Sequence, residues 1–301
     1  MERRFSNISE TAKSTLRTAG GVIKAIASTK KGAIGLSLSA FFFSMATIGP
    51  IVAPIDLKYV NPSDFYLPPS LEHPLGTDYF GKDVLRLIIL GSREVLSIGV
   101  LAALITLSIA LIAGLSSGFI GGWVDAALTT AMDITLTIPA FPLLLVLVAL
   151  FRGASGILFM AAILSVNAWA GLARAIRSRV LGIKEREFVE AAKCLGLGNL
   201  HLIFREILPN LMGYIVIILI TGVTGAIYAE VALFTLGVAP YSQANWGVML
   251  NMALMHAGAV TSARYANLLA PALFIALLQI GLVSLSSSLE QYINPRLREE
   301  E

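Results

Sequence analysis

The chain has 301 residues, of which 56% are hydrophobic and only 14% are charged, and its mean hydropathy is +0.79. A soluble globular domain carries about 25% charged residues, so the composition excludes that class, as well as a disordered or collagenous chain. The single cysteine, Cys194, excludes an internal disulfide and any zinc or iron–sulfur site built on several cysteines. The Lys and Arg residues behind the net charge of +3 are concentrated in particular segments, which is typical of a membrane protein rather than of a nucleic-acid-binding protein.

Long uncharged runs predict the architecture. A membrane-spanning helix needs about 20 mostly apolar residues, and without water its backbone amides must bond inside the same helix. The long basic segment before the first run, and the length of the run itself, argue against a cleavable signal peptide. We therefore expect this run to be retained as a span. The runs of suitable length are 32–55, 95–124, 134–151, 153–173, 207–229 and 265–289.

Residues 231–263 also lack charged side chains and are long enough to span a bilayer. Turn-forming residues such as Gly237, Pro240 and Asn245 interrupt this run. We interpret it as an outer loop with a short helix at about residues 247–255, and a seventh span is the alternative.

The distribution of Lys and Arg predicts the orientation. With the N-terminus in the cytoplasm and six spans, 16 of these residues lie inside and six outside, which favours two cytoplasmic termini. The predicted fold class is an all-α membrane protein with six transmembrane helices. Its segments are a cytoplasmic N-terminal tail (1–32), a first transmembrane helix (33–55), an extracytoplasmic loop with an amphipathic helix (56–93), a core of five transmembrane helices (94–290) and a cytoplasmic C-terminal tail (291–301).

The loop between the fourth and fifth predicted spans, at about residues 184–209, is too polar to enter the bilayer. Gly196 ends a first helix in this loop, Asn199 can cap a second short helix, and Pro209 suits the first turn of the fifth span. The pattern predicts a helix–turn–helix at the cytoplasmic surface that either rests on lipid headgroups or docks a soluble partner, and both interpretations stay open. The first helix has apolar residues at i, i+3, i+4 and i+7, which predict a single stripe: Phe188, Ala191, Ala192 and Leu195.

Two groups of motifs resemble a known family. One group resembles the EAA signature of ABC-importer permeases, although Glu206 stands where that signature has Ile. The other is similar to the C-type permeases of dipeptide and oligopeptide importers, in which Arg is usual at the position of Lys82. The first group is Glu190-Ala191-Ala192, Gly196 and Leu208-Pro209. The second is residues 73–83, Gly91-Ser92-Arg93, Ala229-Glu230, Leu236-Gly237, Trp246-Gly247 and residues 294–298.

The resemblance covers about residues 71–298 and implies a permease subunit that forms half of the pore of an ATP-driven importer. The implied partners are a second, B-type permease, two cytoplasmic ATPases that bind ATP and Mg, an extracytoplasmic substrate-binding protein and the lipid bilayer, with no nucleic acid. The implied location is the plasma (inner) membrane of a prokaryote. The 184–209 loop would be a coupling helix that inserts into an ATPase through Glu190, Ala191, Ala192, Leu195, Gly196, Leu208 and Pro209.

Neither a cofactor nor a catalytic site is expected in this chain, because no nucleophile–base pair, carboxylate dyad or metal cluster stands out. Oligopeptides or dipeptides are the favoured cargo, and oligosaccharides or nickel are the alternatives that the resembled group includes. A secondary transporter driven by an ion gradient is the alternative of another class. Such a transporter favours paired midplane charges and repeated halves.

Three residues are candidates for a pore or outer-gate lining, namely Asn167, Trp169 and Glu230. A carboxylate at membrane depth is costly unless it faces a cavity or a partner. Glu230 is therefore expected either to line the translocation path or to make a structural bond near the outer interface.

Two further patterns are weaker. Residues 76–83 nearly spell a Walker A loop, but Asp83 replaces the Ser or Thr that would bind Mg²⁺. We expect a turn there, followed by a helix that Asp78 or Asp83 caps. A soft metal site is conceivable on one helix face, but Met at this spacing more often fills gaps in packing. The residues of that face are Met249, Met252, Met255 and His256.

Proline and glycine residues predict local features of the spans. Proline removes a backbone donor and kinks helices, and glycines at four-residue spacing permit close approach of two helices. The prolines are Pro139, Pro142 and Pro271, and the glycines are Gly114, Gly118 and Gly122.

Overall fold

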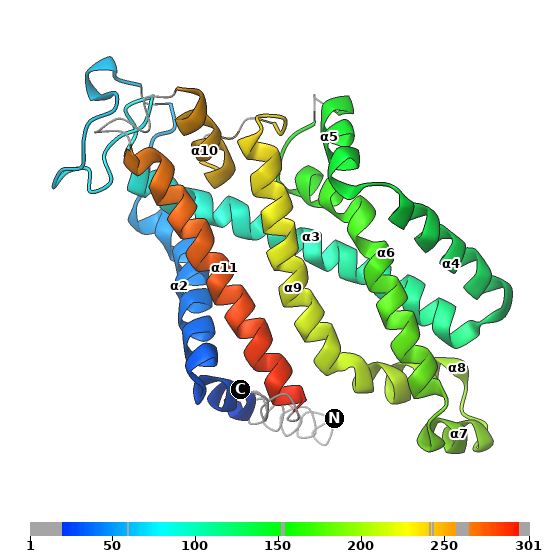
Figure 1. The fold of residues 1–301 in the computed structure, drawn as a ribbon. Helices are drawn as coiled ribbons and strands as arrows, with labels where there is room; N and C mark the ends of the chain where they lie inside the picture. The colour runs from blue at the N-terminus through cyan, green and yellow to red at the C-terminus, as the bar shows by residue number, and fades with distance from the viewer. Residues whose placement is uncertain are drawn as a thin grey trace, which may run out of the picture.

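The computed structural model describes residues 20–58, 60–151, 154–240, 242, 244–256 and 265–294. In these residues the regular structure is helical, apart from one isolated β-bridge between Thr77 and Asp83. The all-α fold class is confirmed. Figure 1 labels the helices α2 (Lys30–Val52), α3 (Val84–Ile120), α4 (Gly122–Thr137), α5 (Ala140–Leu150), α6 (Ile157–Lys184), α7 (Glu187–Cys194), α8 (Asn199–His201), α9 (Leu208–Thr235), α10 (Trp246–Met255) and α11 (Tyr265–Ile293). A 3₁₀ turn, η1, covers Pro62–Asp64, and a π-helical turn, η2, covers Leu202–Ile207.

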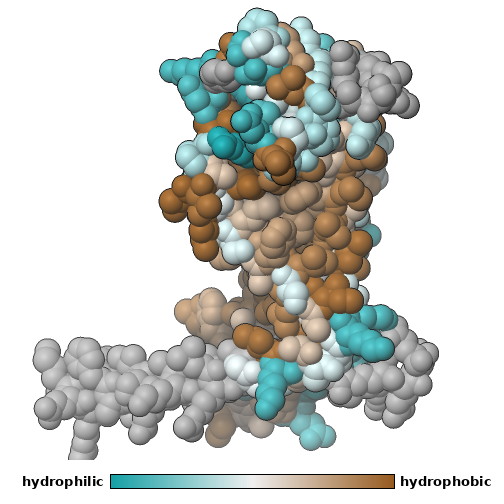
Figure 2. Space-filling model, turned by 90° about the vertical axis from the view of Figure 1, so that its left-hand side faces the viewer, coloured by the Kyte–Doolittle hydropathy of each residue, from teal (hydrophilic) through white to brown (hydrophobic). Residues whose placement is uncertain are grey.

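Among the described residues, five helical stretches are long and apolar enough to cross a bilayer, namely α2, α3, α6, α11 and the stretch from α8 to α9, Asn199–Thr235. α4 and α5 together meet the same criteria, but they are bent by 85° at a break. Figure 2 shows hydrophobic side chains gathered across the middle of the visible face and hydrophilic side chains toward both ends. Hydrocarbon covers a surface of this kind, so the chain is a multi-pass membrane protein.

The third predicted span, 134–151, is a bent pair of helices rather than one helix. α4 already begins at Gly122, and the helix breaks at Ile138 and Pro139 before α5 begins. Proline has no N–H and disfavours helical backbone in the residue before it. Ile138 accordingly has extended backbone, with φ −83° and ψ 121°. Pro142 lies in the first turn of α5, where proline is tolerated.

α3 is longer than its uncharged run, because the helix begins at Val84 rather than near residue 95. The amphipathic helix that we expected before the second span is therefore the first part of α3. Asp83 is its N-cap, since Oδ1 accepts the Arg86 N–H at 2.9 Å, while Oδ2 lies 2.9 Å from His73 Nδ1. The sequence that resembles a Walker A loop is thus a turn that leads into a capped helix, as predicted.

α3 crosses the molecule obliquely and packs closely against α6 (Figure 1). Glycines make this approach possible: a Cβ on Gly114 would lie 2.7 Å from Ala173 O, and one on Gly118 would lie 2.9 Å from Val180 Cβ. The prediction of close helix approach is therefore confirmed for these two residues. Gly122 instead begins α4, with a φ of +57°.

α10 and the segment 53–83 lie together at the end of the molecule opposite α7 (Figure 1). With ten residues α10 is about 15 Å long, too short to cross a bilayer. The short helix predicted at 247–255 is thus confirmed. Residues 257–263 of the same uncharged run, and most of both predicted tails, lie outside the described residues. Pro271 lies inside α11 without ending the helix.

Candidate functional site

α7 is a short polar helix on the loop between α6 and α8, at one end of the molecule (Figure 1). Glu187 and Glu190 lie in its first turn and Lys193 in its last turn, so these charges complement the partial charges of the two helix ends. The side chain of Glu190 is exposed, and so is that of Ala191 beside it. Both residues are therefore accessible to another protein surface.

A glycine turn ends α7, as predicted. Gly196 has a φ of +71°, the left-handed conformation that glycine adopts without strain. Its N–H donates to Lys193 O at 2.9 Å, and the Leu197 N–H donates to Ala192 O at 3.3 Å. These two hydrogen bonds form a Schellman motif, which satisfies carbonyls at the end of the helix and fixes the direction in which the chain leaves it.

The predicted apolar stripe of α7 is divided between two faces. Ala192 is only 6% exposed and packs in a cluster with residues of η2 and α9, and Val189 is also fully buried. Leu195, by contrast, is 77% exposed. The prediction of a single exposed stripe is therefore wrong. A helix of this length needs one face that packs on the protein, and Val189 and Ala192, three residues apart, form that face. We call the residues left on the other side the outer face of α7; they are Phe188, Glu190, Ala191 and Leu195.

The second helix of the loop, α8, continues through η2 into α9 with no loop between them. Pro209 lies in the first turn of α9, as predicted, but the π-helical turn η2 connects that turn directly to α8. In a regular α-helix the Pro209 ring would clash with the carbonyl of Arg205 and leave it without a donor, and a wider π turn before the proline relieves this conflict. Leu208 is half-buried and Pro209 is exposed, so neither lies on α7 itself.

Ion pairs tie α6 to α4, and hydrogen bonds tie both helices to α3. The Arg177 guanidinium donates to both carboxylate oxygens of Asp125, with Nε–Oδ1 and Nη2–Oδ2 distances of 2.6 Å. Thr129 donates to the same carboxylate at 3.1 Å, and so does Ser117 of α3. Further contacts are the Arg174–Asp133 pair and the 2.6 Å hydrogen bond from Lys184 Nζ to Phe119 O. A bidentate pair fixes geometry as well as distance, so α3, α4 and α6 are held as one unit next to α7.

An open cavity of about 340 Å³ lies between α3, α5, α6 and α9. Asn167 lines it, and Asn167 Nδ2 donates to Thr135 O at 3.0 Å and to Ile138 O at 3.4 Å. In a continuous helix these carbonyls would accept from residues 139 and 142, which are both proline. Asn167 thus replaces the donors that the two prolines lack. Small residues make up much of the remaining wall, among them Ala102, Ala103, Gly222, Gly225 and Ala226.

The other two lining candidates do not reach this cavity. Trp169 is half-buried and lines a separate apolar groove between α3, α4 and α6. Glu230 is fully buried, and its Oε1 accepts from Asn245 Nδ2 at 2.7 Å. The burial of Glu230 favours the second of its two interpretations, a structural bond.

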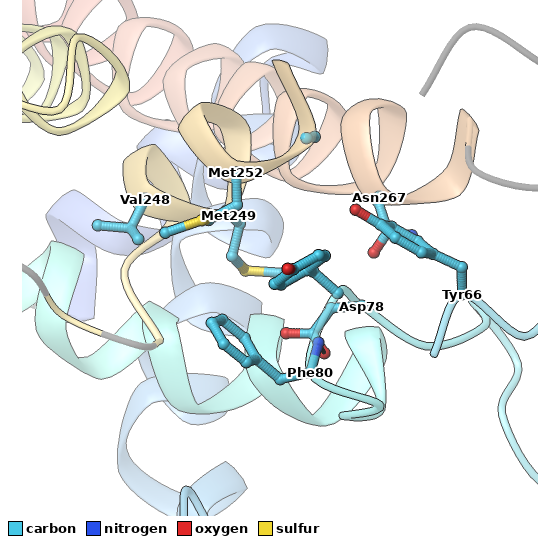
Figure 3. Close-up of a pocket in the computed structure, with 9 residues that line it drawn as sticks. Tyr66, Asp78, Phe80, Val248, Met249, Met252 and Asn267 are labelled. Atoms are coloured by element: carbon cyan, nitrogen blue, oxygen red, sulfur yellow. Dashed lines mark hydrogen bonds between the residues drawn. The ribbon is translucent and has the colours of Figure 1, made fainter. Parts of the chain in front are cut away.

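Aromatic and methionine side chains surround a small hollow at the end opposite α7 (Figure 3). Its free space of about 30 Å³ admits one or two water molecules but no organic ligand. Met249 and Met252 face it, whereas Met255 is largely exposed and His256 stacks on Tyr79 at 4.0 Å. The four members of the candidate metal face therefore do not converge, which favours the packing interpretation.

Asp78 lies at the wall of the same hollow (Figure 3). Its Oδ1 accepts the N–H groups of Phe80 (2.9 Å) and Lys82 (2.8 Å). Burial nevertheless raises the pKa of this carboxyl above its usual value of 3.8, because desolvation outweighs those hydrogen bonds. Burial also lowers the pKa of the Lys82 ammonium, which donates to Leu57 O at 2.6 Å. The turn thus holds a buried ammonium group and a half-buried carboxyl group close to each other.

Sequence reasoning missed the pairing of α4 with α6. A signal for it was present, because Asp125 and Asp133 are eight residues apart and lie near one face of a helix. Arg174 and Arg177 are three residues apart and share a face in the same way. Opposite charges on matching faces of two largely apolar helices favour pairing inside the protein over exposure to lipid.

Long apolar helices and a polar helix at one end define the class of this protein as a multi-pass membrane protein with an accessible polar loop. Residues 96–299 match the family described as binding-protein-dependent transport system inner membrane component. The chain belongs to this family.

Relatives of known name extend the similarity over most of the chain. The dipeptide transport system permease protein DppC of Bacillus subtilis (strain 168) is 35% identical over 267 residues, which cover 88% of this chain and 81% of the relative. The oligopeptide transport system permease protein OppC of the same strain is 32% identical over 272 residues, covering 90% and 87%. DppC of Alkalihalophilus pseudofirmus is 31% identical over 277 residues, covering 91% and 89%.

Proposed function

We propose that this chain is one of two permease subunits that form the translocation path of an ATP-driven peptide importer. The names of its relatives, dipeptide and oligopeptide transport permeases, support this cargo. Oligosaccharides or nickel are the alternative cargo for the same type of complex. The structural observation that carries the mechanism is the exposed outer face of α7, on a helix whose other face packs against η2 and α9.

In this proposal α7 and both termini face the cytoplasm of a prokaryotic cell. The start of α2, the end of α11 and α7 all lie at the same end of the molecule (Figure 1). Described basic residues at this end include Lys30, Lys31, Arg186 and Lys193, which supports placing this end in the cytoplasm and the chain in the plasma (inner) membrane. The segment 53–83 and α10 then lie at the extracytoplasmic surface, where a substrate-binding protein would deliver the cargo.

Two cytoplasmic ATPases supply the movement in this mechanism. Their closure on ATP displaces the outer face of α7, and buried Val189 and Ala192 transmit the displacement to η2 and α9. α6, which leads directly into α7, carries it to α4 and α3 through the Arg177–Asp125 pair. The cavity between α3, α5, α6 and α9 then changes the side to which it opens. ATP biases this switch only by binding its two states unequally.

The cavity is suited to be a translocation path for peptides with varied side chains. None of the described residues that line it is charged, and Asn167 and two threonines are the polar members of its wall. A weakly polar wall retains no particular peptide, so cargo selection falls to the substrate-binding protein. The second, B-type permease supplies the opposite wall of the path.

This proposal assigns neither catalysis nor a cofactor to the chain. ATP and Mg bind to the partner ATPases, and nucleic acid is not a partner. Among the described residues there is no group of three or more His, Cys, Asp or Glu that could hold a metal ion.

Co-purification of the ATPases with α7 variants tests the proposal. Glu190→Arg and Leu195→Asp alter exposed side chains outside the core, so the subunit should still fold and insert. Both variants should lose most of the bound ATPase and most of the ATP-dependent peptide uptake. Glu290→Arg, which alters an exposed carboxylate on α11, is the matched control and should keep both.

Two results would contradict the proposal. One is retention of the ATPase by both α7 variants at the level of the Glu290→Arg control. The other is peptide uptake that continues without ATP and collapses with the ion gradient, which would support the secondary transporter instead.

A further inference from the structure

Two carboxylates lie close together where α3 and α9 meet the turn before α10. Glu230 of α9 is 0% exposed, and Glu94 of α3 is half-buried. The side-chain amide of Asn245 reaches both, with Nδ2 at 2.7 Å from Glu230 Oε1 and at 3.5 Å from Glu94 Oε1. These two carboxylate oxygens therefore cannot be farther apart than the sum of those distances.

The hydrogen bonds around the pair leave one oxygen without a donor. Asn245 Oδ1 accepts the Gly247 N–H at 2.9 Å and caps α10, which directs its NH₂ group toward the carboxylates. Glu94 Oε2 accepts from the Ser242 hydroxyl at 2.6 Å. Glu230 Oε2 is buried, and no donor among the described residues reaches it. A buried acceptor in this state is costly when it carries charge.

No positive charge balances the pair in the described part of the chain. Glu230 is the only charged residue of α9, and α10 has none. On α3, Arg86 and Arg93 are both exposed, as is Tyr228 on α9. The turn between α9 and α10 has no charged residue, and its Tyr241 lies outside the described residues. Two ionised carboxylates would repel each other strongly in these surroundings.

We propose that Glu94 and Glu230 form a site that binds one proton, which Glu230 holds on Oε2. A protonated Oε2 is a donor itself, so it needs no donor beside it. Glu230 Oε1 still accepts from Asn245, and Glu94 keeps its bonds from Ser242 and Asn245. One bound proton thus removes the second charge, and a neutral oxygen without a partner costs far less than an ionised one.

This proton holds three parts of the chain together. Glu94 belongs to α3, Glu230 to α9, and Ser242 and Asn245 to the turn that leads into α10. Loss of the proton would place a second negative charge beside the single Asn245 amide and push α9 away from α3 at this end. If the proposed function holds, this junction lies beside the cavity that the neighbouring Ala229 lines, and uptake should fall at a pH that removes the proton.

Infrared spectroscopy of the full-length protein in lipid vesicles tests the site without reference to transport. A protonated carboxylic acid has a carbonyl stretch that ionised carboxylates lack. We expect this band at neutral pH in the wild type, its loss in Glu230→Gln, and its retention in Glu94→Gln. Glu290→Gln, which alters an exposed carboxylate, is the matched control and should leave the position and intensity of the band unchanged.

Thermal unfolding provides the second readout. Glu230→Gln should keep the fold, because an amide has the shape and the donor of a protonated carboxyl group. Absence of the infrared band in the wild type, or its persistence in Glu230→Gln, would overturn the proposal. So would a large drop in the melting temperature of Glu230→Gln together with stabilisation of the wild type by added Na⁺ or Mg²⁺, since this would indicate a bound cation rather than a proton.

Discussion

At the scale of single residues, Asn167 compensates for two prolines at once. Its amide donates to the carbonyls of Thr135 and Ile138. In a continuous helix these carbonyls would accept from residues 139 and 142, which are both proline. Asn167→Leu should therefore lower the free energy of unfolding by about 1 kcal/mol, the usual net contribution of a hydrogen bond. Denaturant unfolding of the purified chain in detergent measures this loss.

Asn210→Leu is the matched control for that experiment. Asn210 is exposed and donates only to Glu206 O of its own helical stretch, so its loss should change the stability by a few tenths of a kcal/mol. Equal effects of the two substitutions would show that Asn167 does not support the break.

Asp78 makes the stability of the outer segment depend on pH. Between the usual carboxyl pKa of 3.8 and the raised pKa of Asp78, the folded chain binds more protons than the unfolded chain. The free energy of unfolding should therefore fall as pH rises through this range. Asp78→Asn keeps an oxygen that accepts the Phe80 and Lys82 N–H groups but cannot titrate, so the slope should flatten.

Melting temperatures across the acidic range measure that slope. Glu72→Gln, a substitution of an exposed carboxylate in the same segment, should leave it unchanged. A slope in Asp78→Asn as steep as in the wild type would contradict the role of Asp78.

At the scale of elements, the Arg177–Asp125 pair joins α6 to α4. Its two side chains are 27% and 23% exposed, whereas those of the Arg174–Asp133 pair are 50% and 57% exposed. Double-mutant cycles with leucine should give the first pair a coupling energy of about 1–3 kcal/mol and the second pair less than about 1 kcal/mol. Equal coupling energies would contradict the idea that the first pair holds the helices together.

The sequence predicted the class of the fold and most helices, because apolar length is a direct requirement of the bilayer. It did not predict where helices would break or join. The break at Pro139 and the continuation through Pro209 both involve proline, and only the local surroundings decide between them. Asn167 supports the break, and the π turn η2 accommodates the continuation.

The candidate site was predicted in part. The pattern around Glu190 and Gly196 correctly indicated a short helix ended by a glycine turn. It could not show that Ala192 faces inward, since the inner face depends on where η2 and α9 lie. The network of Glu94 with Glu230 was also beyond the sequence, because 136 positions separate two residues that share one Asn245 amide.

At the scale of the whole molecule, the two ends have different chemistry. One end carries α7 and the start of α2, which include the basic residues Lys193, Lys30 and Lys31, and the opposite end carries the segment 53–83 and α10 (Figure 1). A hydrophobic band separates them on the face that Figure 2 shows. The central claim is that α7 lies in the cytoplasm and contacts an ATPase there.

Labelling of the single cysteine tests this claim most directly. Cys194 is the last residue of α7 and is exposed. A membrane-impermeant maleimide should leave it unlabelled in intact cells, label it after permeabilisation, and label it several-fold more slowly when the ATPases are bound. A Cys194→Ser, Leu71→Cys variant, with its cysteine in the exposed outer segment, should react in intact cells. Labelling of Cys194 from outside, or equal rates with and without the ATPases, would contradict the account.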